Sequence, residues 1–211
     1  MTSHSNQFAQ LGQQFIKKLD LLWSELEKSD KVVNEVIEEI FPYAFVLPGS
    51  YLHLHKAVHE GHGDVSHFYS KSFIDGTENR DFVMDMIIAQ NTTETLCSQI
   101  WQAYMLSHAD TILPCFWHGG YGVRTFIFSE DDINSIEHFK NRDWTVISSL
   151  DDLLPRVTRL SDNTCQVVCH YWNEWQGLVR ETYIYTLNGA MIKHIEKKQE
   201  ILYPYHCGIW F

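Results

Sequence analysis

The chain has 211 residues, of which 45% are hydrophobic and 20% are charged, and this composition excludes disordered and fibrous proteins. Twenty-seven acidic residues against sixteen Lys and Arg residues give a formal net charge of -11. That charge repels nucleic acids and anionic membrane surfaces at long range, so we predict neither of them as a partner.

The first fifteen residues lack the basic start and continuous apolar run of a secretion signal, and no apolar run reaches the roughly 18 to 20 residues of a membrane span. The five cysteines are an odd, scattered set, unlike the dense framework of a small secreted domain. We therefore predict a cytoplasmic protein with reduced thiols. Without a linker or repeat, residues 1–211 are expected to form a single domain, with a helical N-terminal segment over 6–40 and an α+β body over 41–211.

Apolar residues at steps of three and four predict an amphipathic helix over residues 6–28. These residues are Phe8, Leu11, Phe15, Leu19, Leu22 and Leu26. Ser29-Asp30 can cap a second helix that carries valines and isoleucines at helical spacing and ends at Pro42. Both helices are expected to pack on the protein's own sheet, because the pattern is too short for a sustained coiled coil.

The middle of the chain mixes strands and helices. The compact apolar run within 81–90 predicts a buried strand, and a capping pattern at Asn91 to Glu94 introduces a helix over 93–108. A glycine-rich break between 112–117 and 123–128 predicts a hairpin, and Ser129 is placed to cap a short acidic helix.

The last third predicts three strands, at residues 165–173, 178–187 and 190–202. The dipeptide Asn188-Gly189 between the last two is a strong hairpin signal, so the three strands are expected to form an antiparallel meander. The predicted fold class is α+β, with N-terminal amphipathic helices packed on a mainly antiparallel sheet and a C-terminal three-stranded meander.

The leading functional hypothesis is a small-molecule-binding protein with a pocket between the helices and this sheet. If Asn188 and Gly189 form the loop, Glu181 faces Glu196 and Tyr183 faces His194, all on one side of the hairpin. Two opposed carboxylates beside a tyrosine and an imidazole could perform acid-base chemistry, with one carboxylate held protonated by the other. A solvated sheet surface is the alternative. Ketosteroid-isomerase-like folds, in which helices cover a curved antiparallel sheet, offer a fold-level analogy for such a pocket.

A histidine-rich stretch is the second candidate site. It contains five of the twelve histidines, His53, His55, His59, His62 and His67. In an extended segment His53 and His55 point the same way, and Glu60 and His118 could complete a site for a divalent transition metal such as zinc, iron or manganese. The alternative is that these histidines populate a polar, solvated loop.

The run Gly49-x3-His53-x-His55-x4-Glu60 resembles the first metal motif of the cupins, and Pro114-x3-His118 distantly resembles their second motif. The resemblance implies His53, His55, Glu60 and His118 as metal ligands of a metal-dependent enzyme. It covers a small part of the chain, and His67 and Gly122 stand where the cupin pattern has Gly and Asn, so we do not assign the family.

A third hypothesis is a non-catalytic interaction module. The N-terminal helix and the aromatic segment 203–211 would then assemble the chain, for example as a homodimer. The aromatic segment is expected to dock on the core or on a partner subunit, because it is too apolar to extend into water.

Overall fold

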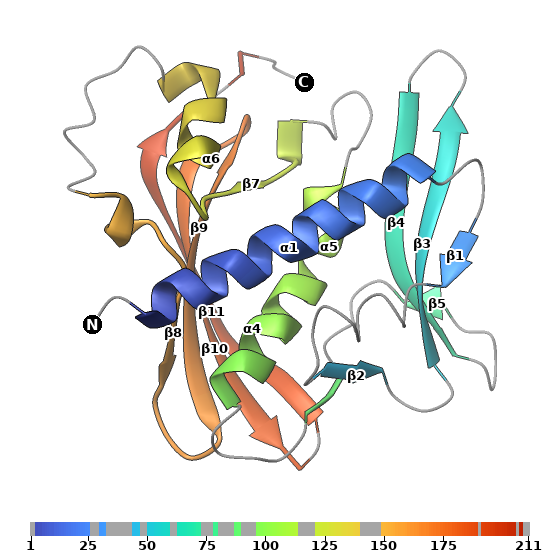
Figure 1. Cartoon of the computed structure of the whole chain (residues 1–211), viewed down its shortest axis with the longest axis vertical. Coiled ribbons are helices and arrows are strands. Elements are labelled where there is room, and N and C mark those ends of the chain that lie inside the picture. The colour runs from blue at the N-terminus through green and yellow to red at the C-terminus, as the bar shows by residue number, and fades with distance from the viewer. Residues whose placement is uncertain are drawn as a thin grey trace.

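The chain folds into two antiparallel sheets and a set of helices, in agreement with the predicted α+β class (Figure 1). The computed structural model describes residues 3–25, 30–32, 44–46, 50–59, 63–72, 78–79, 87–89, 96–113, 121–139, 149–189, 191–205 and 207–208. Every strand pair within these ranges is antiparallel.

The larger sheet contains the predicted C-terminal meander, which is confirmed. Its strands are, in spatial order, β2 (Ala44–Val46), β6 (Ile87–Ala89), β11 (Met191–Pro204), β10 (Gly177–Asn188), β9 (Thr164–Asn173) and β7 (Thr125–Phe126), with β8 (Arg156–Arg159) also paired to β9. Burial alternates along β10, as expected for strands whose side chains point to opposite faces. We call the face that carries Val179, Tyr183 and Tyr185 the inner face, and the opposite one the outer face.

The smaller sheet has the order β1 (Asp30–Val32), β3 (Ser50–His59), β4 (Gly63–Ser72) and β5 (Glu78–Asn79). The second helix predicted after Ser29-Asp30 is wrong at residues 30–32, which form β1 and pair with β3. Lys31 and Val32 adopt a strand conformation, because pairing with β3 outweighs a weak helical pattern of β-branched residues. Residues 33–40 lie outside the described part of the chain.

The predicted helices at residues 6–28 and 93–108 are confirmed as α1 (Ser3–Glu25) and α4 (Leu96–Ser107). The acidic helix is α6 (Glu130–Ser135), and the Ser129 side chain caps it by accepting from the Asp132 backbone N–H. Three further short helices lie in the described ranges, α5 (Ala109–Ile112), η2 (Glu137–Phe139) and η3 (Leu150–Asp152).

The hairpin predicted between residues 112–117 and 123–128 is wrong where the structure describes it. Ile112 ends α5, and β7 pairs with β9 instead of with a neighbour in sequence. Phe126 of β7 is buried and Thr125 is partly buried, and both pair with β9. A partner distant in sequence therefore takes the place of the predicted local one. Residues 114–120 lie outside the described part of the chain.

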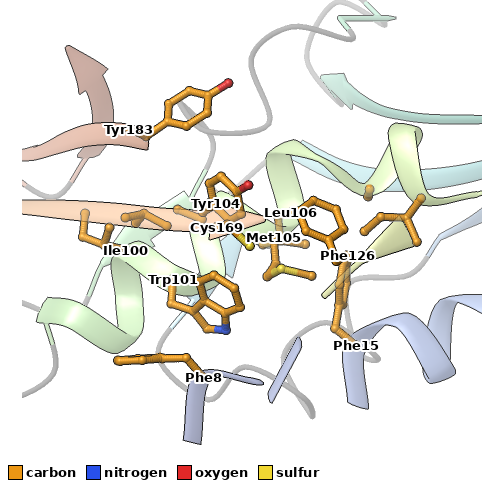
Figure 2. Packing of buried hydrophobic residues seen from close by; sticks show 14 of the residues in the cluster. Phe8, Phe15, Ile100, Trp101, Tyr104, Met105, Leu106, Phe126, Cys169 and Tyr183 are labelled. Carbon is orange, nitrogen blue, oxygen red and sulfur yellow. The ribbon is translucent and has the colours of Figure 1, made fainter. Parts of the chain in front are cut away.

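Helices α1 and α4 cover the inner face of the larger sheet, with α1 crossing over α4 and β8 (Figure 1). Trp101 of α4 is fully buried at the centre of this contact, with ring centroids 5.9 Å from Phe8, 5.5 Å from Tyr104 and 5.9 Å from Phe128. Figure 2 shows Phe8 and Phe15 of α1 directed at this cluster. The apolar stripe of α1 is therefore buried on the protein's own core, as predicted.

Gly12 marks the closest approach of α1 to the core, and replacing it by Ala is expected to destabilise the protein by about 1 to 3 kcal/mol. A Cβ atom at Gly12 would lie 2.5 Å from Phe128 Cε2, and the Phe128 ring is itself buried and stacked on Phe126. The sign is opposite to the usual effect of Gly to Ala in a helix. Urea unfolding measures the difference, with the exposed Gln13→Ala as a control that is expected to be neutral or slightly stabilising. A Gly12→Ala protein as stable as the control would contradict this close packing.

Candidate functional site

The pairing of β10 with β11 differs from the predicted register in two ways. Asn188 pairs with Met191, so the turn begins one residue later than predicted, and Gly189 adopts a left-handed φ of 61° in it. A bulge then interrupts the ladder, because Tyr185 pairs with His194 while Ile184 pairs with Glu196. Each change moves a partner. The bulge also reverses the face to which the β11 side chains from Glu196 to Ile201 point, up to a second register shift between Val179 and Leu178.

The predicted pairing of Glu181 with Glu196 is therefore wrong. Glu181 lies opposite Gln199 on the inner face, whereas Glu196 lies opposite Ile184 on the outer face. Glu196 borders an outer-face hollow of about 300 Å³, whose lining residues are Gln166, Arg180, Thr182, Ile184, Glu196, Lys198 and Glu200. Because the two carboxylates point to opposite faces, neither can hold the other protonated.

The Glu181 carboxylate is fully buried and is surrounded by hydrogen-bond donors. Its Oε2 atom lies 3.2 Å from the Tyr104 hydroxyl, 3.0 Å from Arg124 Nη1 and 3.2 Å from His108 Nε2. Its Oε1 atom lies 2.8 Å from Gln199 Nε2 and 3.1 Å from Lys197 Nζ. We call these six residues the Glu181 cluster. They come from α4, the turn after it, the segment before β7, and strands β10 and β11, so the cluster joins the helices to the sheet.

Glu181 is held in its ionised form. Burial alone would raise the pKa of this carboxyl group, but the hydrogen bond from His108 and the charges of Arg124 and Lys197 outweigh burial and hold the pKa well below its usual value. Tyr104 and Arg124 donate hydrogen bonds to Oε2 of Glu181, and Gln199 donates one to Oε1. The carboxylate thus accepts on both oxygen atoms. The hypothesis of a protonated carboxylate therefore does not describe Glu181.

His108 and Tyr104 are donors to this carboxylate. Burial lowers the pKa of the His108 imidazole, although the hydrogen bond with Glu181 opposes that shift. His108 Nδ1 lies 2.7 Å from the Tyr104 carbonyl oxygen and 3.1 Å from Ser107 Oγ, which fixes the ring at the end of α4. Burial raises the pKa of the Tyr104 hydroxyl well above its usual value, so this group keeps its proton.

Arg124 and Lys197 give the cluster an excess of positive charge, because these two cations contact one carboxylate. The Arg124 guanidinium lies 4.2 Å from the centroid of the Tyr171 ring, and the Lys197 ammonium lies 5.3 Å from that of Tyr183. The Arg124 side chain is 12% exposed and that of Lys197 is 41% exposed. Both cations thus reach from the buried carboxylate toward solvent.

Tyr183 and His194 lie on the inner face with Glu181, and their ring centroids are 5.9 Å apart. Tyr183 stacks on Tyr185 at 5.4 Å and its ring also contacts His108 at 5.4 Å, so it separates the core from the exposed His194. In Figure 2 the Tyr183 hydroxyl points away from the labelled core residues. Three of the four predicted acid-base residues thus share a face, and their catalytic role stays a prediction.

The partners of Glu181 were not predicted from the sequence. An acidic residue on the buried face of a strand usually requires a cation nearby. Glu181 lies between Val179 and Tyr183 on the face that the alternation predicts to be buried, so the sequence indicated such a cation. Which of the sixteen Lys and Arg residues would be that partner depends on tertiary contacts, because Arg124 lies 57 residues before Glu181.

The outer face holds a second buried histidine. His170 Nδ1 lies 2.9 Å from the Leu153 carbonyl oxygen, while its Nε2 atom accepts from Arg180 Nε at 3.1 Å. These two partners require a neutral ring with its proton on Nδ1. Burial lowers the pKa of His170 to about 4. Arg180 also pairs with Glu200 at 3.2 Å, so the charges at the rim of the hollow are balanced there.

The predicted metal ligands lie largely beyond what the structure describes. His53 and His55 are on β3, where the register pairs His55 with His67 of β4. Glu60 and His118 lie outside the described residues. The zinc, iron or manganese site and the metal-dependent activity therefore stay predictions.

The beginning of the aromatic segment 203–211 docks on the outer face of the chain's own sheet. The Tyr205 ring centroid lies 4.1 Å from that of His138 and 5.2 Å from that of Trp172. The backbone N–H of Tyr205 donates to the Gln176 carbonyl oxygen at 3.1 Å. Residues 206 and 209–211 lie outside the described part, and assembly through this segment stays a prediction.

Comparisons with the models of known protein families, with curated proteins and with solved structures found no match to this chain. Within the ranges that the structure describes, no helix combines the length and the apolar character of a membrane-spanning segment.

Proposed function

We propose that the chain binds a small organic anion, one with a carboxylate or phosphate group, at the inner face beside Arg124 and Lys197. The observation that carries this proposal is the unequal charge of the Glu181 cluster, in which two cations share one fully buried carboxylate. An anion next to Lys197 would balance the remaining positive charge and accept charge-assisted hydrogen bonds.

The exposed part of the inner face supports the same location. Helices α1 and α4 bury the inner-face side chains of β9 and β10, whereas those of β11 are exposed from His194 to Ile201. A ligand over β11 would meet Lys197 and Gln199 at the surface, with the Tyr183 ring as an apolar wall. Arg124 uses Nη1 for Glu181, and within the described part of the chain its Nε and Nη2 atoms make no hydrogen bond.

Binding fits the geometry of Glu181 better than acid-base catalysis does. A general acid or base must exchange a proton with the substrate near the working pH. Glu181 is fully buried, accepts hydrogen bonds from several donors and has a strongly lowered pKa, so it is suited to holding Arg124 and Lys197 in place. We therefore assign Glu181 to positioning and the two cations to ligand recognition.

The test measures stabilisation by anions in two variants of equal charge, Lys197→Gln and Lys198→Gln. Lys197 faces the Glu181 cluster, whereas its neighbour Lys198 borders the outer-face hollow. The probes are sodium succinate, citrate and phosphate, applied at constant ionic strength in thermal unfolding and isothermal titration calorimetry, with sodium chloride as the reference.

At least one probe is expected to raise the Tm of the wild-type protein above the chloride reference. Lys197→Gln is expected to weaken that binding about tenfold or more, because it removes a charge-assisted contact, while Lys198→Gln keeps it. The proposal is overturned if no probe exceeds chloride, if Lys197→Gln binds as tightly as the wild type, or if Lys198→Gln weakens binding as much as Lys197→Gln does.

A further inference from the structure

Two cysteines from distant parts of the chain meet at the edge of the main core. Cys97 lies in the first turn of α4 and Cys165 lies near the start of β9, and their Sγ atoms are 3.7 Å apart. Cys165 is fully buried, whereas Cys97 is partly exposed. Neither thiol belongs to the anion site proposed above.

The two thiols differ in acidity because of their surroundings. The hydrogen bond with Cys165 lowers the pKa of the Cys97 thiol to about 7, and the positive charge of Arg159 acts in the same direction. The same contact and burial raise the pKa of Cys165. Arg159 stands beside the pair because β8 pairs Arg159 with Cys165 in register. Cys97 is also the partly exposed thiol, so it is the nucleophile that a solute can reach, and Cys165 is its buried partner.

We propose that Cys97 and Cys165 form a modification site that a peroxide converts into a disulfide linking α4 to β9. The Cys97 sulfur attacks one oxygen of the peroxide, the O–O bond breaks, and the leaving oxygen departs as water or an alcohol with the proton it takes up. Cys97 is then a sulfenic acid. The Cys165 sulfur attacks the Cys97 sulfur, the S–O bond breaks, and the hydroxide leaves as water with the Cys165 proton. Two thiols lose two electrons, and the peroxide gains them.

The short distance between the two sulfur atoms allows Cys165 to attack the Cys97 sulfenic acid directly. The sulfur atoms need to close from 3.7 Å to about 2.0 Å to form the bond. Cys165 is the protected partner, so the sulfenic acid meets it before a thiol from solution. Among the described cysteines, Cys169 is fully buried and burial raises the pKa of its thiol, so it is a poor competitor for the peroxide.

The consequence for the protein is a covalent tie between the central helix and the sheet. The disulfide would close a loop that runs from α4 through β7 and β8 to β9. A cross-link across so long a loop restricts the unfolded chain, so the oxidised protein is expected to melt several degrees above the reduced protein.

The experiment treats the native, fully reduced protein with one to a few equivalents of hydrogen peroxide. Catalase then quenches the peroxide, the remaining thiols are alkylated in urea, and the digest is analysed by mass spectrometry. We expect a peptide pair joined through Cys97 and Cys165 as the main product, and dithiothreitol should reverse it. Cys207→Ser is the matched control and should form the same product, because the partly buried Cys207 follows β11 and lies next to Glu174, away from the pair.

The two single variants separate the steps. Cys97→Ser is expected to abolish the cross-link, and in Cys165→Ser the Cys97 sulfenic acid should accumulate and react with dimedone. Circular dichroism checks that the wild-type protein is native when the peroxide is added, so the wild-type result stands even if Cys165→Ser fails to fold. Recovery of Cys97 as an over-oxidised acid with Cys165 alkylated would overturn the proposal. Equal alkylation of both wild-type thiols after peroxide, or a main cross-link through Cys207, would also overturn it.

Discussion

Replacing Glu181 by Gln is expected to lower the free energy of unfolding by about 3 to 5 kcal/mol, which is the scale for breaking a buried ionic contact on one side. The substitution leaves Arg124 beside the core without its counter-charge. It also places an amide N–H₂ group where Tyr104 and His108, or Lys197 and Gln199, donate to an oxygen. Urea unfolding followed by tryptophan fluorescence measures the loss.

Glu196→Gln is the matched control for this experiment. It makes the same chemical change and the same change in net charge on the neighbouring strand, but Glu196 is exposed on the outer face. Its effect is expected to stay under about 0.5 kcal/mol. Equal effects of the two substitutions would show that Glu181 is not a buried ionic centre and would remove the basis of the proposed anion site.

Stability is expected to fall as the pH falls from about 7 to about 5, and His170 is expected to account for about 2 kcal/mol of this loss. Its pKa is lowered by burial to about 4 in the folded protein, against 6.5 for an ordinary histidine. The unfolded chain therefore binds more protons between these two values, so the stabilisation is complete above about pH 6.5 and is lost as the pH falls toward 4. His108 acts in the same direction, because burial also lowers its pKa.

His170→Asn tests this assignment, because an Asn amide can still donate to the Leu153 carbonyl oxygen and does not titrate. The quantity to compare is the change in unfolding free energy between about pH 7 and about pH 5, measured by urea unfolding at both pH values. The variant is expected to lose about 2 kcal/mol less than the wild type over this interval, whatever its absolute stability. A variant with the wild-type pH dependence would show that His170 is not held neutral by its surroundings.

Much of the fold could be predicted, because helix α1 and the β10–β11 hairpin are determined by patterns of residues close together in the sequence. The spacing of Phe8, Phe15 and Leu19 is the spacing of a helix face, and all three residues are buried in α1. The Asn188-Gly189 dipeptide correctly predicted the β10–β11 hairpin. In contrast, β1 and β7 are short strands that form because distant partners are present, and no local pattern identifies those partners.

The candidate site was predictable only in part, for two physical reasons. The bulge at Ile195 inserts one residue into β11 and sends Glu196 to the outer face, and nothing in the alternation of the strand marks that residue. The cations of the Glu181 cluster also approach from segments that are remote in sequence. Glu181 and Tyr183 were identified because they lie on the buried face of a predictable strand, whereas Arg124 depended on how the chain folds back on that strand.

The most direct test of the ionised Glu181 is the chemical shift of its side-chain carboxyl carbon. This carbon can be followed by ¹³C NMR in protein labelled at glutamate, with the signal assigned by its absence from the Glu181→Gln spectrum. The signal is expected to stay at the position of an ionised carboxylate from about pH 7 to about pH 4, while ordinary exposed glutamates begin to titrate. A Glu181 signal that moves with them, or at a higher pH, would contradict a carboxylate held ionised by Arg124 and Lys197.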